Sequence, residues 1–129
     1  MRRLSTLGWG LLLVAGCSVG TSARSYAPAK GPAGAILELR FTDETRMTAE
    51  LLAVEDSALL LLHDAQVTRV PLSQVQSGRG PKVSFSQELG ARTRERLRLI
   101  SRYPQGVSPE LEGRLLQAYG QAAVVTRPS

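Results

Sequence analysis

Three kinds of residue in this chain have side chains that could do chemistry. The 129-residue sequence contains one cysteine, Cys17, and one histidine, His63. Arginines recur at four-residue spacing at Arg94, Arg98 and Arg102. A thiolate is a nucleophile and a metal ligand, an imidazole can transfer protons, and guanidinium groups bind phosphate and carboxylate. Which of these roles is open to each group depends on the elements that position it.

Cys17 follows a segment with the character of a secretory signal. Met1-Arg2-Arg3 is a positively charged start, and residues 4–15 are apolar apart from serine, threonine and glycine. This stretch is too short for a transmembrane helix, which needs about 20 apolar residues. Because Cys17 is the only cysteine, no disulfide can form within the chain. We therefore expect an exported protein whose single thiol has another role.

The run Leu13-Val14-Ala15-Gly16-Cys17 resembles the lipobox of bacterial lipoproteins. The resemblance implies that residues 1–16 are a signal peptide, cleaved between Gly16 and Cys17, and that the Cys17 sulfur carries a palmitate-type lipid. Several acyl chains, at about 0.8 kcal/mol per buried methylene, would anchor the protein stably. The residue after the cysteine, Ser18, is not the aspartate of inner-membrane retention, so the resemblance implies an outer-membrane lipoprotein facing the periplasm. The alternatives are an ordinary secretory signal cleaved near Ala15 and a buried apolar terminus of a cytosolic protein.

Residues 17–34 are predicted to be a flexible tether. After Cys17 they are rich in serine, alanine, glycine and proline and have no apolar period. A random coil of this length spans about 20 to 25 Å. This reach is enough to hold the folded domain clear of the headgroups.

The charge of the chain does not require a nucleic-acid partner. The formal net charge is +5, of which Arg2 and Arg3 would leave with the signal peptide. The location outside the cytoplasm argues against nucleic acid, and aromatic residues, at 5%, supply few stacking surfaces for bases. Anionic lipid headgroups and an envelope protein remain as expected partners beside the lipid anchor.

Residues 35–86 predict a small β domain, because apolar and polar side chains alternate with the period of a strand. Leu37, Leu39 and Phe41 alternate with Glu38 and Arg40, which is typical of a half-buried strand. We expect four strands in a meander at about residues 37–41, 47–54, 58–62 and 67–70, then one helical turn at 72–74, a loop at 77–82 and a fifth strand or its continuation at 83–85.

Three runs of sequence resemble the Sm-like class of small barrels: Ala-Glu-Leu-Leu-Ala-Val-Glu-Asp-Ser at 49–57, the apolar run at 58–62, and Val-Thr-Arg-Val-Pro-Leu-Ser-Gln-Val at 67–75. In that class a long bent second strand precedes an apolar third, and a one-turn helix separates strands four and five. The resemblance implies a five-stranded SH3-like or Sm-like barrel. Its RNA-binding residues are missing: Arg79-Gly80 is the nearest match, and the chain has no asparagine.

Residues 87–123 are predicted to form a helical hairpin on or beside the barrel, so the fold class is mainly β with C-terminal helices. Leu89, Thr93, Leu97 and Ile100 recur at helical spacing over about residues 87–102. Ser108-Pro109-Glu110 is a helix start, with serine as N-cap and proline in the first turn. The hairpin would cover an open end of the barrel or present a surface to a partner.

The arginine series lies on the predicted first helix, opposite its apolar stripe. Such a series is usually a solvated helix face. The functional alternative is that Arg94, Arg98 and Arg102 contact an anionic surface, at about 1 kcal/mol per residue.

No set of residues predicts catalysis, a cofactor or a metal site. His63 has Asp64 beside it but no nucleophile or second ligand at useful spacing, so a turn histidine is the simpler interpretation. We therefore expect a non-catalytic binding or assembly module of the cell envelope. The alternatives are a self-associating structural scaffold, with the chain forming an oligomer, and a hydrolase whose site is not recognised.

Overall fold

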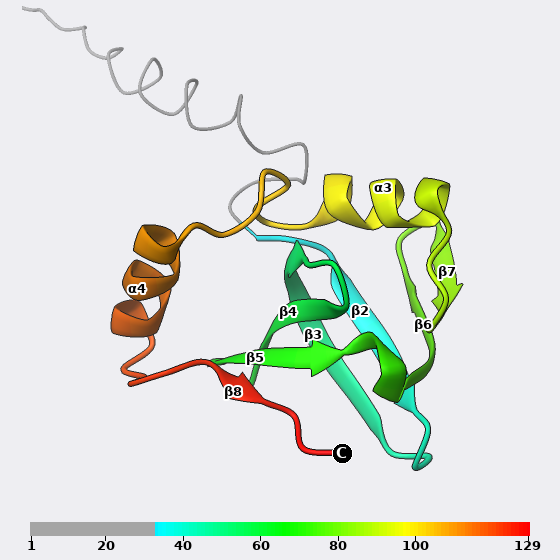
Figure 1. The fold of residues 1–129 in the computed structure, drawn as a ribbon, viewed down its shortest axis with the longest axis horizontal. Coiled ribbons are helices and arrows are strands. Elements are labelled where there is room, and N and C mark those ends of the chain that lie inside the picture. The colour runs from blue at the N-terminus through cyan, green and yellow to red at the C-terminus, as the bar shows by residue number, and fades with distance from the viewer. Residues whose placement is uncertain (1–32) are drawn as a thin grey trace, which may run out of the picture.

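The computed structural model of the chain describes residues 33–129 (Figure 1). The predicted signal peptide, the lipidation of Cys17 and nearly all of the predicted tether lie outside the described residues.

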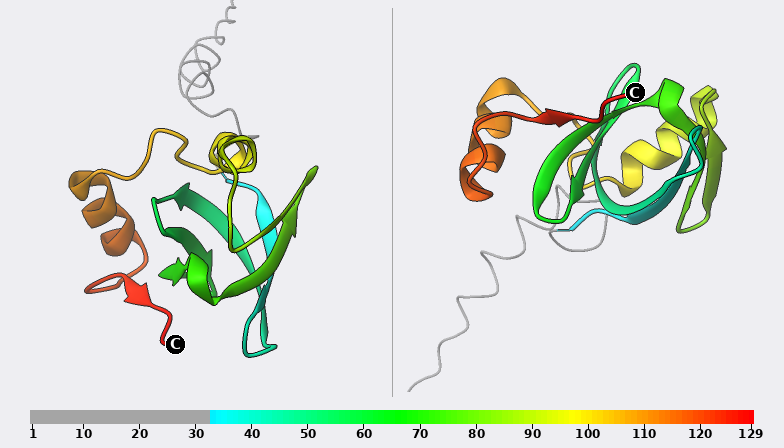
Figure 2. Two further views of the ribbon diagram at one scale, coloured as in Figure 1. Left: turned by 45° about the vertical axis from the view of Figure 1, so that its right-hand side comes forward. Right: turned by 90° about the horizontal axis from the view of Figure 1, so that it is seen from below.

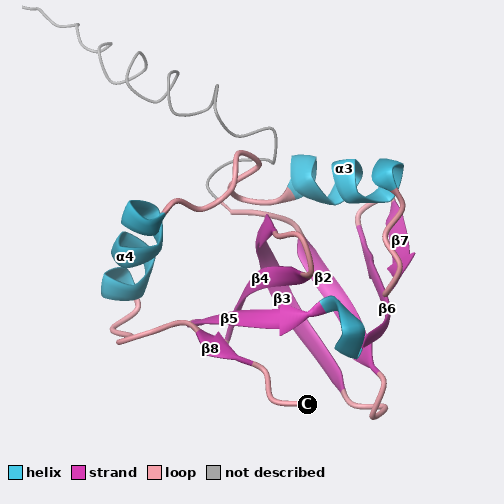
Figure 3. Ribbon diagram, in the orientation of Figure 1, coloured by secondary structure: helices cyan, strands magenta, loops and turns pink. Residues whose placement is uncertain are grey.

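The described chain is mainly β, with two helices after the first six strands (Figure 3). The strands are joined in one seven-stranded sheet of order β7-β6-β2-β3-β4-β5-β8. Neighbouring strands are antiparallel except β5 and β8, which are parallel. The elements are β2 (Ile36–Phe41), β3 (Arg46–Val54), β4 (Ala58–His63), β5 (Gln66–Pro71), the short 3-10 helix η1 (Leu72–Gln74), β6 (Val75–Gly80), β7 (Val83–Ser86), α3 (Ala91–Ile100), α4 (Pro109–Ala118) and β8 (Val125–Thr126).

The sheet curls but is open, with β7 at one end of its order and β8 at the other (Figure 2). The predicted meander of β2 to β5 and the single turn at 72–74 are confirmed, whereas a closed five-stranded barrel is not what the chain forms. The expected loop at 77–82 was wrong, because β6 runs to Gly80 and pairs with β7. Its glycines serve close packing here, since a Cβ on Gly78 would lie 2.3 Å from the Phe85 ring.

Strands β3, β4 and β5 are buried on both faces, which explains their nearly continuous apolar sequence. On β3, Leu51 faces one core and Leu52 the other, and both are fully buried. A shift of register between Leu51 and Ala53 marks an irregularity in this strand. The first core also holds Leu37, Leu39, Phe41, Ala49, Leu59, Leu61, Val70, Leu72, Val75, Val83, Phe85 and Leu97, and the second holds Ala53, Leu60, Val67 and Leu115.

The two helices pack over different cores. Leu97 of α3 is buried in the first core and Leu115 of α4 in the second, and the views of Figures 1 and 2 show the helices well apart. The segment between them is bonded to the end of β3, where Arg102 N donates to Leu51 O and Tyr103 N to Leu52 O. Two separate helices therefore take the place of the expected hairpin, because hydrogen bonds to β3 hold the linking segment and the helices pack over different cores.

Candidate functional site

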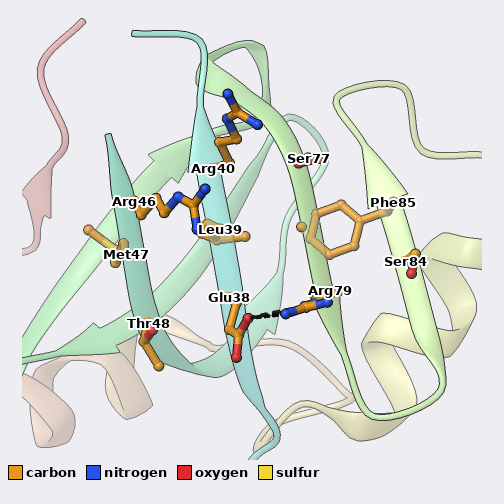
Figure 4. Close-up of a pocket in the computed structure, with 11 residues that line it drawn as sticks. Glu38, Leu39, Arg40, Arg46, Met47, Thr48, Ser77, Arg79, Ser84 and Phe85 are labelled. Atoms are coloured by element: carbon orange, nitrogen blue, oxygen red, sulfur yellow. Dashed lines mark hydrogen bonds and ion pairs between the residues drawn. The ribbon is translucent and has the colours of Figure 1, made fainter. Parts of the chain in front are cut away.

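A groove that could receive a partner runs across β3, β2, β6 and β7 (Figure 4). Its volume is about 530 Å³. We call it the sheet groove. It is lined by Glu38, Leu39, Arg40, Arg46, Met47, Thr48, Ser77, Gly78, Arg79, Ser84 and Phe85.

The period of the strands gives the sheet groove its polar character. On β2, Leu39 is buried in the core while Glu38 and Arg40 on either side of it are exposed. The register then sets these side chains beside polar neighbours, since Arg40 lies opposite Arg46 on β3 and Ser77 on β6. The sequence alternation that predicted a half-buried strand therefore also predicts the polar outer face.

Arginine dominates the charge of the groove. Arg79 and Glu38 form an ion pair of 3.0 Å, but both side chains are more than half exposed, so the pair is weak. Arg40 has only a 3.5 Å contact with Glu44. Arg46 forms no ion pair with any residue of the described part of the chain. The groove can therefore accept a carboxylate or another anionic group.

A second, smaller hollow of about 420 Å³ adjoins the sheet groove and shares Arg79 and Ser84 with it. It lies between the β6–β7 turn and the first half of α3. Lys82, Arg92 and Arg96 also line it, with Gly80, Val83 and Thr93, and no acidic side chain is among these residues. Sequence reasoning did not bring this set together, because only the fold places the β6–β7 turn beside the helix.

The three arginines predicted as a possible contact for an anionic surface, Arg94, Arg98 and Arg102, have hydrogen-bond partners within the protein. Arg94 donates to the backbone oxygens of Glu55 and Asp56, at 2.7 and 3.0 Å. Arg98 pairs with Glu95 and donates to Pro104 O at 2.8 Å. These contacts hold the β3–β4 turn and the end of α3. Two of the three guanidinium groups therefore have partners that stabilise the fold.

Arg102, the third, lies beyond the end of α3 and forms a two-point ion pair with Glu50. Its Nε and Nη2 donate to the two carboxylate oxygens at 2.7 and 2.6 Å. Only 20% of the Arg102 side chain and 9% of that of Glu50 are exposed. The hydrogen bond to Glu50 raises the pKa of Arg102 above its usual value, so the guanidinium stays charged.

The sequence predicts His63 to be a turn residue, but it is the last residue of β4 and comes directly before the turn of Asp64 and Ala65. Its Nδ1 is 3.1 Å from Thr48 O and its Nε2 is 3.4 Å from an Asp64 carboxylate oxygen. It lines neither the sheet groove nor the hollow beside it. The ionisable side chain beside the His63 ring is that of its sequence neighbour, Asp64.

Residues 33–129 contain no cluster of three or more histidine, cysteine or acidic side chains that could bind a metal ion. None of the helices in this part of the chain is long and apolar enough to span a bilayer.

No protein-family model, no curated protein and no solved structure matches this chain. The site therefore has to be interpreted from its own geometry.

Proposed function

We propose that this chain is a lipoprotein of the bacterial cell envelope, anchored through lipid on Cys17, whose folded part is a non-catalytic binding or assembly module. The anchor is proposed from the lipobox-like run ending at Cys17. The outer membrane, with the protein facing the periplasm, is proposed from Ser18 at the following position.

The observation that carries the binding role is the sheet groove. Exposed grooves and patches are typical of partner recognition, whereas catalytic sites more often enclose their substrate. Arg40 and Arg46 lie side by side on neighbouring strands with little or no neutralisation. An acidic segment of another envelope protein fits this arrangement, because guanidinium groups bind carboxylates in two-point geometry.

We further propose that the β domain is a relative of the Sm-like class in a less closed form. Three features support the resemblance: a long second strand, β3, with an irregular register, an apolar third strand, β4, and the single turn η1 between the next two strands. We propose no RNA-binding role, since the residues of that class that bind RNA have no counterpart here.

The anchor is tested with Cys17→Ser in the full-length protein, with Ser18→Ala as the matched control. Fractionation and gel mobility should show loss of the lipid-dependent membrane fraction and altered migration for Cys17→Ser alone. Unchanged membrane association and mobility would contradict lipidation. Ser18→Asp should move the protein toward the inner membrane, and unchanged fractionation of that variant would contradict the proposed outer-membrane address.

The groove is tested by crosslinking and affinity purification of the full-length lipoprotein from its own membranes. Arg40→Glu with Arg46→Glu should lose a specific protein partner, while Arg114→Glu on α4 should keep it. Retention of the partner by the groove variant would place its binding site elsewhere. Recovery of a ladder of self-crosslinked multimers would favour the scaffold function instead.

One observation favours that second function, a self-associating scaffold. Strand β7 ends the sheet order and has a neighbour, β6, on one side only. An unpaired strand edge can add a strand from another copy. Sedimentation of a chain beginning at residue 18 tests this, and a monomer across the concentration range would count against it.

A further inference from the structure

The side of the molecule at which the described chain begins carries unneutralised positive charge and two exposed apolar side chains. The backbone N–H of Ala35 donates to Ile100 O, at the end of α3, at 2.9 Å. Figure 1 shows the start of β2 and the whole of α3 on this side. We call this side, defined by Ile36, Lys82, Arg92, Arg96 and Leu99, the α3 surface.

The positive charges of the α3 surface have no carboxylate partner. Lys82, Arg92 and Arg96 line the smaller hollow, and none of them forms an ion pair with any of residues 33–129, the part of the chain that holds all eleven acidic residues. Arg96 has one contact, from Nη1 to Lys82 O at 3.4 Å. The eight ion pairs of the described chain involve other cations, so these three, like Arg46 of the sheet groove, are available to an outside anion.

The local backbone adds to this positive field. The first turn of α3 holds Arg92 and no acidic residue, so no carboxylate of that turn offsets the positive end of the helix dipole. Lys82 has a φ of 60°, a conformation that usually selects glycine. At this position of the turn glycine would cost less conformational energy than lysine. The chain nevertheless has a charged side chain here, and it lines the hollow.

The apolar part of the α3 surface adjoins the Ala35–Ile100 bond. Ile36 and Leu99 are each one residue from that bond, and they are the two most exposed large apolar side chains of the described residues, at 54% and 42%. Along α3, Arg92, Arg96 and Leu99 follow at spacings of four and three, so they share one helix face. Binding to an anionic membrane grows with both the apolar area that is buried and the attraction of cationic side chains, and the α3 surface offers both.

We infer that the α3 surface docks directly on the anionic phospholipid headgroups of the membrane that holds the lipid anchor. This inference rests on the proposed function, because the anchor is what keeps a membrane within reach of the domain. The described chain begins on this side of the domain, and Ala33 is only 16 positions after Cys17, so the anchor and the surface would meet the same leaflet. Lys82, Arg92 and Arg96 would bind phosphate, and Ile36 and Leu99 would enter the headgroup layer.

The test uses a chain beginning at residue 18, which lacks the anchor but keeps both cores, since these are built only from residues 37–124. Flotation is measured with vesicles of phosphatidylethanolamine and phosphatidylglycerol, and with phosphatidylcholine alone. We expect binding to the anionic vesicles only, weakened by salt. Binding to neither kind, or to both equally, would overturn the inference.

The residues are tested singly and together. Each basic residue near an anionic surface contributes about a fivefold affinity. Arg92→Gln should therefore weaken binding about fivefold, and Arg114→Gln, an exposed arginine on α4, less than twofold. Lys82→Gln with Arg92→Gln and Arg96→Gln should weaken binding about 100-fold, and Leu99→Gln should weaken it further, with unchanged thermal unfolding. Equal effects of Arg92→Gln and Arg114→Gln would show a response to net charge alone and overturn the assignment.

A last experiment distinguishes the phosphate of a lipid headgroup from a soluble phosphate. Inorganic phosphate and glycerol phosphate should fail to displace the protein from the vesicles at equal ionic strength. Displacement by either would show a site for a soluble phosphate and overturn membrane docking. The docking test and the anchor test can fail separately. The vesicle experiments use a chain without Cys17, and the fractionation of Cys17→Ser changes none of the residues of the α3 surface.

Discussion

Glu50 on β3 and Arg102 after α3 form a nearly buried two-point ion pair at the place where the folded domain begins. The same carboxylate accepts a hydrogen bond from Gly34 N at 2.6 Å. Three separate segments therefore meet at one side chain: the start of the domain, the centre of the sheet and the end of α3.

Removing either partner of this pair should destabilise the domain strongly. Arg102→Ala leaves the Glu50 carboxylate buried with one hydrogen-bond donor, and the loss of one partner of a buried pair costs about 3 kcal/mol. Arg102→Lys should cost less, because it keeps the charge and loses only the second hydrogen bond. Urea unfolding measures both. As a control, Arg79→Ala breaks the exposed pair with Glu38 and should cost less than about 1 kcal/mol; equal losses would contradict the buried role.

Gly34 should tolerate no side chain. A Cβ at this position would lie 2.2 Å from Leu51 O and 2.5 Å from Arg102 N, both backbone atoms that cannot turn aside. We expect Gly34→Ala to cost about 2 kcal/mol or more, as overpacked sites do. Gly113→Ala in α4 meets nothing within 4 Å and should stabilise by about 1 kcal/mol, because alanine has the higher helix propensity. Opposite signs of the two changes in unfolding free energy are the result to look for.

Gln121 should be needed to complete the edge of β5. Its side-chain amide accepts from Val67 N at 2.6 Å and donates to Val67 O at 3.1 Å, as a neighbouring strand would. Val67 is fully buried, so Gln121→Ala leaves two polar groups without partners and should cost about 1 to 3 kcal/mol. Hydrogen exchange of the Val67 amide should rise above that of the rest of β5. Unchanged protection would show that another group replaces the amide.

The sequence predicted those parts of the fold that depend on local pattern. Alternation located β2 to β5, and Ser108 does cap α4, accepting from Leu111 N at 3.2 Å. The side chains that are buried on both faces of β3 and β4 follow from the continuous apolar runs. Each of these features is decided by neighbours within a few residues.

The missed features depend on contacts between distant segments. Helical spacing predicted that the first helix extends to residue 102. It ends at Ile100, because the backbone N–H of Arg102 donates to Leu51 O. This bond places the Arg102 side chain beside Glu50. The glycines of β6 suggested a loop, because the packing of Gly78 against Phe85 and of Gly80 against Leu37 is not visible in the sequence. The α3 surface was missed for the same reason: Lys82 is ten residues from Arg92 and meets it only in the fold.

The turn between β2 and β3 should make stability depend on pH in the acid range. Hydrogen bonds from the Thr45 hydroxyl and backbone N–H, together with Arg127, lower the pKa of Asp43 below its usual value. A carboxylate with a lowered folded-state pKa contributes stability that is complete above its unfolded pKa of about 3.9 and is lost as pH falls through the folded pKa. Urea unfolding of Asp43→Asn should therefore vary less with pH below about 4 than that of the parent chain.

Asp43 also holds Arg127, whose guanidinium carbon lies 3.7 Å from the centre of the Phe41 ring and which donates to Gln74. Amide exchange of Val125 and Thr126 should therefore rise in the variant at neutral pH, whereas the matched change Asp56→Asn, in the β3–β4 turn, should leave it unchanged; a parallel pH profile for parent and Asp43→Asn would refute the assigned role of this carboxylate.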